Sequence, residues 1–208
     1  MQRIGLFVLS IFMLNACDIS VTNEETLALE ERHQVGQIKT AMGDIYIWLH
    51  SDTPVHRRNF IELAEAGYWD DYSFNRVIEG FVVQGGCPDT EEGFAYSIHL
   101  LEPEFRPNLR HDYGSFAAGR DNNPGKLSAG CQFYIVQDRD GIARLDDNYT
   151  KYGQVFKGMD VIESIVKVET DEADAPLTVI TLDVNVIEMT RQEIEAEGFK
   201  IPVSNGEL

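Results

Sequence analysis

The chain has 208 residues, 43% of them hydrophobic and 25% charged, which is typical of one globular domain with short appendages. Its formal net charge of −18 at pH 7 argues against a nucleic-acid backbone or an anionic membrane surface as a partner. We therefore expect no nucleic-acid partner.

The first residues, MQRIGLFVLSIFMLNAC, have the pattern of an export signal. Arg3 precedes an apolar run from Ile4 to Leu14 that is too short to span a bilayer, and small residues follow before Cys17. The LNAC end resembles the lipobox of bacterial lipoproteins, in which the cysteine is acylated and becomes the first residue of the mature protein. We predict a signal peptide over residues 1–16 and lipidation at Cys17, with a plain secretory signal cut nearby as the alternative.

The next segment, residues 17–34, is polar and rich in glutamate. Such a composition buries too little apolar surface to fold, so we predict a lipid-anchored flexible spacer. The anchor would place the protein in a bacterial cell envelope, facing the periplasm, with the inner and outer membranes both open as sites. Because the chain is acidic, we expect the anchor to be its only contact with the membrane.

Most of the chain after residue 34 has the pattern of strands. Residues 43–50 and 177–189 alternate apolar and polar residues with a period of two, which predicts half-buried antiparallel strands. In the first of these segments, one face carries Ile45, Ile47 and Leu49.

Two helices are predicted between the strands. The first has Thr53 as a possible cap, Pro54 at the opening position and Gly67 as a stop. Its inward stripe consists of His56, Phe60, Leu63 and Ala64. The second is predicted over residues 159–166.

One charged residue lies in an otherwise apolar, glycine-bounded segment, FNRVIEGFVVQGG. This residue is Arg76, and Gln84 follows it eight positions later. An arginine keeps its charge and presents five fixed donors, so burying its stem is favourable only if a partner accepts those hydrogen bonds. That partner is either a carboxylate in a structural ion pair or the amide of a substrate.

The segment from Phe74 to Gly86 resembles the signature of the cyclophilin family of peptidyl-prolyl isomerases. The resemblance continues, in the family's order, through NFIELAEAGYWDDYSF, GSFAAG, CQFYI and LDDNYTKYGQVFKGMDVIESI, and covers roughly residues 36–189. It implies a mainly β fold, a closed antiparallel eight-stranded β-barrel capped by two α-helices. We assign this domain to residues 35–190 and a C-terminal tail to residues 191–208.

The resemblance also implies site residues. Arg76 would donate to the prolyl nitrogen, Gln84 would hold Arg76, and Phe133 would lie in the barrel core. The residues that would line the proline pocket or contact the peptide are Phe81, Val82, Ala117, Ala118, Gln132, Tyr134, Leu145 and Tyr149.

Several positions depart from the family pattern. Asn75 replaces the usual histidine, Val82 the usual methionine, and Arg144 the tryptophan of many eukaryotic members. Tyr149 stands where many eukaryotic members have histidine and follows the bacterial pattern.

The resemblance places Cys87 and Cys131 near the same groove. An oxidising envelope could join them in a disulfide, and free buried thiols are the alternative. The five histidines show no paired metal-ligand spacing, so we predict no metal. Residues 121–130 form a turn-rich loop without the context of a phosphate-binding loop, and we expect no nucleotide or other cofactor.

Three functions remain open. The first is a monomeric, lipid-anchored peptidyl-prolyl isomerase that assists the folding of exported proteins and binds proline-containing polypeptides. The second is a non-catalytic module that holds proline-containing segments as a chaperone or scaffold. The third is a tethered barrel that carries a small apolar ligand.

Overall fold

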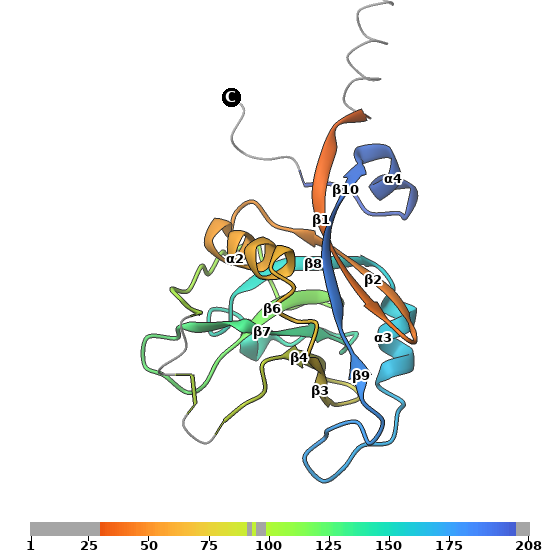
Figure 1. The fold of residues 1–208 in the computed structure, drawn as a ribbon. Helices are drawn as coiled ribbons and strands as arrows, with labels where there is room; N and C mark the ends of the chain where they lie inside the picture. Colours follow the sequence, from red (N-terminus) through yellow and green to blue (C-terminus); the bar gives the residue numbers. More distant parts are fainter. Residues whose placement is uncertain (1–29, 91–92, 95–98, 203–208) are drawn as a thin grey trace, which may run out of the picture.

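The structure is a computed structural model that describes residues 30–90, 93–94 and 99–202 (Figure 1). The predicted signal peptide over residues 1–16, the lipidation at Cys17 and residues 17–29 of the predicted spacer lie outside this range. Within it, no helix combines the length and the hydrophobicity needed to cross a membrane.

Strands dominate the described part of the chain. They are β1 (Arg32–Thr40), β2 (Gly43–Leu49), β3 (Ser73–Val77), β4 (Val82–Gly86), β5 (Leu100–Leu101), β6 (Ser115–Gly119), β7 (Ser128–Val136), β8 (Lys151–Lys157), β9 (Ile180–Thr181) and β10 (Asp183–Thr190). The helices are α2 (Pro54–Glu65), α3 (Met159–Ile165) and α4 (Arg191–Ala196), with a 3₁₀ turn η1 (Ala143–Leu145).

The strands form a closed barrel. Neighbouring strands follow the order β10-β1-β2-β8-β6-β7-β4-β3-β9, and all pairs are antiparallel. Only Leu182 separates β9 from β10, and its N–H donates to the carbonyl of Tyr72 at 3.0 Å. These two segments are therefore one bent strand that pairs with β3 at one end and β1 at the other. Counted in this way, the ring confirms the predicted eight-stranded barrel, with β5 paired to β7 outside it.

Aromatic side chains fill the barrel interior. The alternation predicted for β2 is confirmed, because Ile45, Ile47 and Leu49 are all buried. The core also contains the fully buried phenylalanines Phe60, Phe74, Phe116 and Phe133. Each buried ring contributes about 1.5–3 kcal/mol to stability. An interior occupied in this way gives no support to the hypothesis of a barrel that carries a small apolar ligand.

Helix α2 buries the predicted stripe, but a different residue caps it. The Thr53 hydroxyl donates to the carbonyl of His50 instead of accepting from the first turn of the helix. The Glu104 carboxylate accepts hydrogen bonds from the backbone N–H groups of Val55, at 3.1 Å, and His56, at 2.9 Å. A carboxylate at a helix N-terminus also interacts favourably with the helix dipole. Helix α3 forms where it was predicted and buries Ile162 and Ile165.

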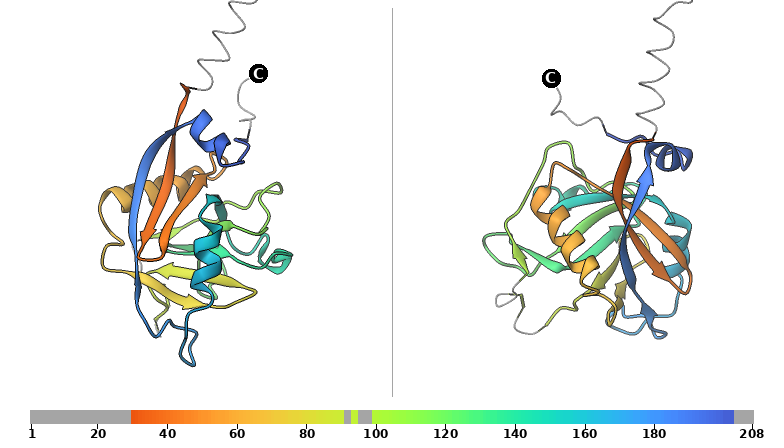
Figure 2. Two further views of the ribbon diagram at one scale, coloured as in Figure 1. Left: turned by 90° about the vertical axis from the view of Figure 1, so that its right-hand side faces the viewer. Right: turned by 45° about the horizontal axis from the view of Figure 1, so that its top comes forward.

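The folded domain extends beyond both of its predicted ends (Figure 2). Strand β1 begins at Arg32, so residues 32–34 pair with β10 and do not belong to a flexible spacer. At the other end, α4 begins with a capping box formed by Thr190 and Glu193, and it buries Ile194 completely. Composition alone placed residues 32–34 in the polar spacer, because their strand partner lies more than 150 residues along the chain.

Candidate functional site

An open pocket of about 190 Å³ lies against β3, β4, β6 and β7, beside η1. Pockets for drug-sized ligands measure roughly 300–1,000 Å³, so this one suits a single side chain. Its lining residues are Arg76, Phe81, Val82, Gln84, Asp89, Gly119, Arg120, Gln132, Tyr134, Arg144, Leu145 and Tyr149. All the predicted catalytic and substrate-binding residues except Ala117 and Ala118 are among them.

The alternation of strands explains which residues face the pocket. Gln84 on β4 lies opposite Tyr134 on β7, and both side chains point out of the barrel into the pocket. Phe133, one residue away, points into the core. Val82 and Leu145 pack with Tyr134 in a small cluster that forms the apolar wall.

The two predicted alanines are both placed differently from the rest. Ala117 is fully buried in the cluster beneath the pocket, and Ala118 packs in the barrel core. The β6–β7 register shifts between Ala118 and Gly119, which brings Gly119 to the pocket instead. A Cβ atom at Gly119 would overlap the side-chain oxygen of Gln132, so any larger residue here would require the Gln132 side chain to move.

Arg76 lies at the mouth of the pocket, directly opposite Gln84 across the β3–β4 pair. Its Nε atom is 3.8 Å from an oxygen of Asp174, its guanidinium carbon is 6.0 Å from the centroid of the Phe81 ring, and its side chain is 36% exposed. The hydrogen bonds of the described residues do not include one between Arg76 and Gln84. The ion pair with Asp174 is long and involves only the Nε atom of Arg76. The terminal N–H groups of the guanidinium are therefore available to a ligand.

A buried polar chain supports the pocket floor. The Nδ1 atom of His111 lies 2.8 Å from the Asp146 carboxylate, and its Nε2 atom lies 3.1 Å from the hydroxyl of Tyr134. Burial lowers the pKa of His111 and raises that of Tyr134 well above its usual value. Burial would raise the pKa of Asp146, but hydrogen bonds from His111 hold it below its usual range. The neutral imidazole therefore donates to Asp146 and accepts from Tyr134, so the hydroxyl proton of Tyr134 is already engaged and is not free for a ligand.

Two arginines that were not predicted as site residues complete the rim. The guanidinium of Arg144 lies 4.7 Å from the centroid of Phe81, and that of Arg120 lies 4.7 Å from the centroid of Tyr149. In the sequence, Arg144 stands out only as a departure from the family pattern. Each arginine directly precedes or follows a predicted pocket segment, and this adjacency is the signal that could have identified them.

Comparison with known proteins agrees with this geometry. The sequence profile described as "Cyclophilin type peptidyl-prolyl cis-trans isomerase/CLD" matches residues 35–186. The chain belongs to the cyclophilin family. Among curated relatives, peptidyl-prolyl cis-trans isomerase 9 of Schizosaccharomyces pombe is 34% identical over 85% of this chain and 30% of its own length. Peptidyl-prolyl cis-trans isomerase-like 1 of Rhizopus delemar is 32% identical over 79% of this chain and 99% of its own length.

This cyclophilin chain spans only 30%, 23% and 27% of the length of three of these relatives, from S. pombe, Arabidopsis thaliana and R. delemar. Solved structures share its fold. A cyclophilin-type isomerase of Cryptosporidium parvum, crystallised in the presence of the dipeptide Ala-Pro, aligns with a TM-score of 0.64 at 23% identity. That alignment covers 74% of this chain and 98% of the C. parvum chain.

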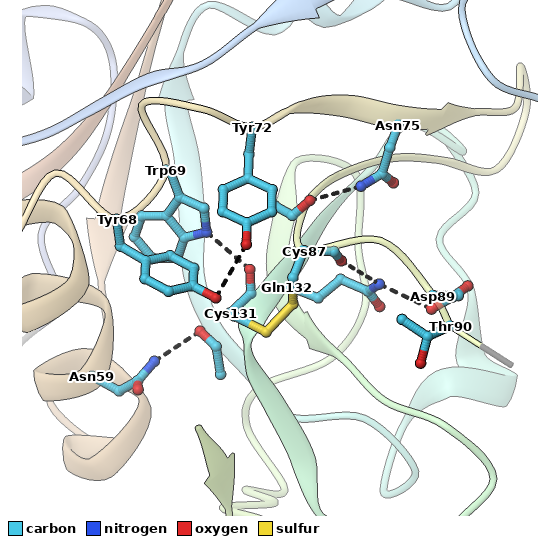
Figure 3. The surroundings of a disulfide bond; sticks show 12 residues. Asn59, Tyr68, Trp69, Tyr72, Asn75, Cys87, Asp89, Thr90, Cys131 and Gln132 are labelled. Atoms are coloured by element: carbon cyan, nitrogen blue, oxygen red, sulfur yellow. Dashed lines mark hydrogen bonds between the residues drawn. A yellow bond between two sulfur atoms is a disulfide. The ribbon is translucent and has the colours of Figure 1, made fainter. Parts of the chain in front are cut away.

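A disulfide joins Cys87 and Cys131 beside the pocket of this cyclophilin, with their Cα atoms 5.5 Å apart (Figure 3). Around it, the indole N–H of Trp69 donates to the carbonyl of Cys131 at 2.9 Å. The side-chain amide of Gln132 donates to the carbonyl of Cys87 and to the Asp89 carboxylate, both at 2.9 Å. The disulfide is therefore next to the backbone and side-chain contacts that hold Gln132 in the pocket lining.

The described part of this cyclophilin contains no group of three or more histidine, cysteine, aspartate or glutamate side chains placed to hold a metal ion. Two of its histidines, His56 and His111, are bonded through Nδ1 to the carboxylates of Glu104 and Asp146.

Proposed function

We propose that the chain is a peptidyl-prolyl cis-trans isomerase in which Arg76 polarises the prolyl nitrogen. One observation carries this proposal: Arg76 lies at the mouth of a small pocket whose wall is formed by Phe81, Val82 and Leu145. A proline ring is a compact apolar group that suits such a pocket, and its nitrogen would then lie within reach of the guanidinium. The names of the curated relatives and the dipeptide used with the C. parvum isomerase also support the proposal.

The reaction requires no acid, base or nucleophile. Resonance sets a rotational barrier of about 18–20 kcal/mol, and the uncatalysed exchange of X-Pro bonds takes tens to hundreds of seconds. A donor aimed at the prolyl nitrogen draws its lone pair out of conjugation, so it stabilises the twisted state more than either planar isomer. An acceleration of about 10⁵-fold corresponds to about 7 kcal/mol.

The test is the cis/trans exchange of an Ala-Pro peptide measured by NMR with the wild type, Arg76→Ala and Arg76→Lys. We expect fast exchange with the wild type and loss of most of the acceleration in both variants, because a lysine lacks the fixed donor fork of arginine. Arg58→Ala serves as the control, since Arg58 lies on α2 with 69% of its side chain exposed. Wild-type rates with Arg76→Ala would contradict the mechanism.

The alternative function is a non-catalytic module that binds proline-containing segments, and the same NMR experiment distinguishes it from an isomerase. The pairing of Arg76 with Asp174 and the departures at Asn75 and Arg144 are compatible with a groove that binds without catalysis. Peptide chemical-shift changes without faster exchange would therefore indicate a non-catalytic module that binds proline-containing segments.

We also propose that the chain is an exported bacterial lipoprotein. We expect it to be a monomer and to assist the folding of other exported proteins. The support is the apolar run that ends in LNAC before Cys17. Expression in a bacterium with labelled palmitate should label the wild type but not Cys17→Ser, and fractionation should find the wild type with the membranes. Secretion of an unlabelled wild-type protein would indicate a plain secretory signal instead.

A further inference from the structure

The pocket carries positive charge in an acidic protein. Three of its lining residues, Arg76, Arg120 and Arg144, are cations, and Asp89 is the one lining carboxylate. The whole chain has a formal net charge of −18. Cations gathered on one small concave surface of such a chain are a local feature that the overall composition does not explain.

Two of these cations, Arg120 and Arg144, take part in none of the ion pairs within 4.0 Å of the described residues, although the charge of Arg120 helps to lower the pKa of the neighbouring Asp121 carboxyl. The guanidinium of Arg120 donates to the backbone carbonyls of Asn148, at 2.7 Å, and Asp121, at 2.8 Å. Arg144 stacks on Phe81 and takes part in none of the ion pairs of the described residues. Backbone carbonyls fix the direction of Arg120 but leave its formal charge in place.

The acidic side chains near the pocket have other partners. Asp89 accepts a hydrogen bond from Gln132, and Asp174 faces Arg76. The Asp121 carboxylate accepts from the backbone N–H of Phe94 and from Asn123, while Asp146 is bonded to His111. The carboxylate groups closest to the rim are thus engaged, and Arg120 and Arg144 keep donors for a ligand.

Arginine binds carboxylates with two parallel hydrogen bonds, and this planar geometry gives specificity as well as energy. The guanidinium groups of Arg144 and Arg120 lie over the rings of Phe81 and Tyr149, and these contacts limit the positions that the two groups can take. We propose that Arg120 and Arg144 select proline-containing segments in which an aspartate or glutamate is adjacent to the proline. This inference rests on the proposed isomerase function and names a substrate class for the same pocket.

The local charges act in spite of the acidic surface around them. At physiological ionic strength the Debye length is about 8 Å, so charges on distant parts of the domain are largely screened at the pocket. Exposed ion pairs contribute about 0.2–1 kcal/mol, which corresponds to a preference of up to about fivefold for each contact.

The experiment measures kcat/KM by NMR exchange for peptides that differ only at the residue before or after proline, which is glutamate, glutamine or lysine. With the full-length wild type we expect glutamate to exceed glutamine by about two- to fivefold at one of the two positions, and lysine to fall below glutamine. Arg144→Gln and Arg120→Gln should each lower the ratio of glutamate to glutamine. The charge reversal Arg144→Glu should favour the lysine peptide, which loss of folding would not do.

Arg139→Gln is the matched control. Arg139 also stacks on an aromatic ring, 4.9 Å from the centroid of Tyr113, but it does not line the pocket. This variant removes the same formal charge and should keep the wild-type ratio. A ratio that falls equally in Arg139→Gln, or a wild-type ratio at or below one at both positions, would overturn the inference.

Failure of the isomerase proposal can be distinguished from failure of the inference that Arg120 and Arg144 select acidic segments. If no peptide exchanges faster, the isomerase proposal fails, and the dissociation constants from NMR chemical shifts decide the inference instead. Tighter binding of the glutamate peptide that is lost in Arg144→Gln would support the inference for a binding module. Equal dissociation constants for the glutamate and glutamine peptides would refute it.

Discussion

Removing the Cys87–Cys131 disulfide is expected to lower the free energy of unfolding by about 4 kcal/mol. The two cysteines are 44 residues apart in the sequence. In the chain-entropy model, closing a loop of that length removes about 13 cal/mol/K of entropy from the unfolded chain, which is about 4 kcal/mol at 25 °C. Most of the effect therefore arises in the unfolded state.

The folded state has independent contacts that hold the same backbone. The N–H of Cys87 donates to the carbonyl of Cys131 at 3.0 Å, and Trp69 and Gln132 donate to the carbonyls of the two cysteines. None of these hydrogen bonds requires a sulfur atom. We therefore expect the protein without the disulfide to keep its pocket and its activity at low denaturant concentration.

The assay is urea unfolding of the oxidised wild type, the reduced wild type and the double variant Cys87→Ala, Cys131→Ala. With a slope near 2 kcal/mol/M, the midpoint should fall by about 2 M urea on reduction, while the double variant should not respond to reductant. A loss below about 1 kcal/mol would refute the loop-closure reasoning. Titration of two thiols at these positions in the unfolded, unreduced protein would refute the bond itself.

Three other perturbations test the supporting structure. Glu104→Ala should lower the free energy of unfolding in urea by about 3 kcal/mol, because donors at the start of α2 lose their acceptor. A loss below about 1 kcal/mol would show that water replaces the carboxylate. Burial, reinforced by Lys151, lowers the pKa of His50 to about 4. The folded state therefore keeps His50 neutral, and roughly 3 kcal/mol of stability, present above pH 6.5, should be lost as the pH falls toward 4. This slope should be smaller in His50→Asn, and identical pH profiles would contradict it. Tyr134→Phe leaves the Nε2 atom of buried His111 without its donor and should cost about 1–2 kcal/mol by thermal or urea unfolding; an unchanged or higher stability would show that this hydrogen bond contributes nothing.

Local patterns in the sequence predicted the parts of the fold that depend on periodicity. The alternation of Ile45, Ile47 and Leu49 identified β2, and the stripe that includes Phe60 identified α2. Most of the pocket residues followed from the resemblance to the cyclophilin family, and the regular alternation of β4 and β7 explains why those residues face the pocket together. Where the period is unbroken, a residue's position in the motif determines the side it faces.

Other features depend on contacts that no local pattern records. Glu104 caps α2 from 49 residues away in the sequence. The register of β6 and β7 shifts after Ala118 and breaks the alternation, so Gly119 lines the pocket in place of the predicted Ala118. The strand partner of Arg32 is Thr190, at the opposite end of the domain. Each of these could be identified only once the chain was folded.

The pairing of β1 with β10 has a consequence for synthesis. Strand β1 is synthesised long before its partner β10, because Arg32 pairs with Thr190 and Val35 with Ile187. Contacts so distant in sequence form slowly, and none of them is available to a partly translated chain. The barrel therefore cannot close before β10 has been made, and until then the edge of β1 that pairs with β10 is open to other strands.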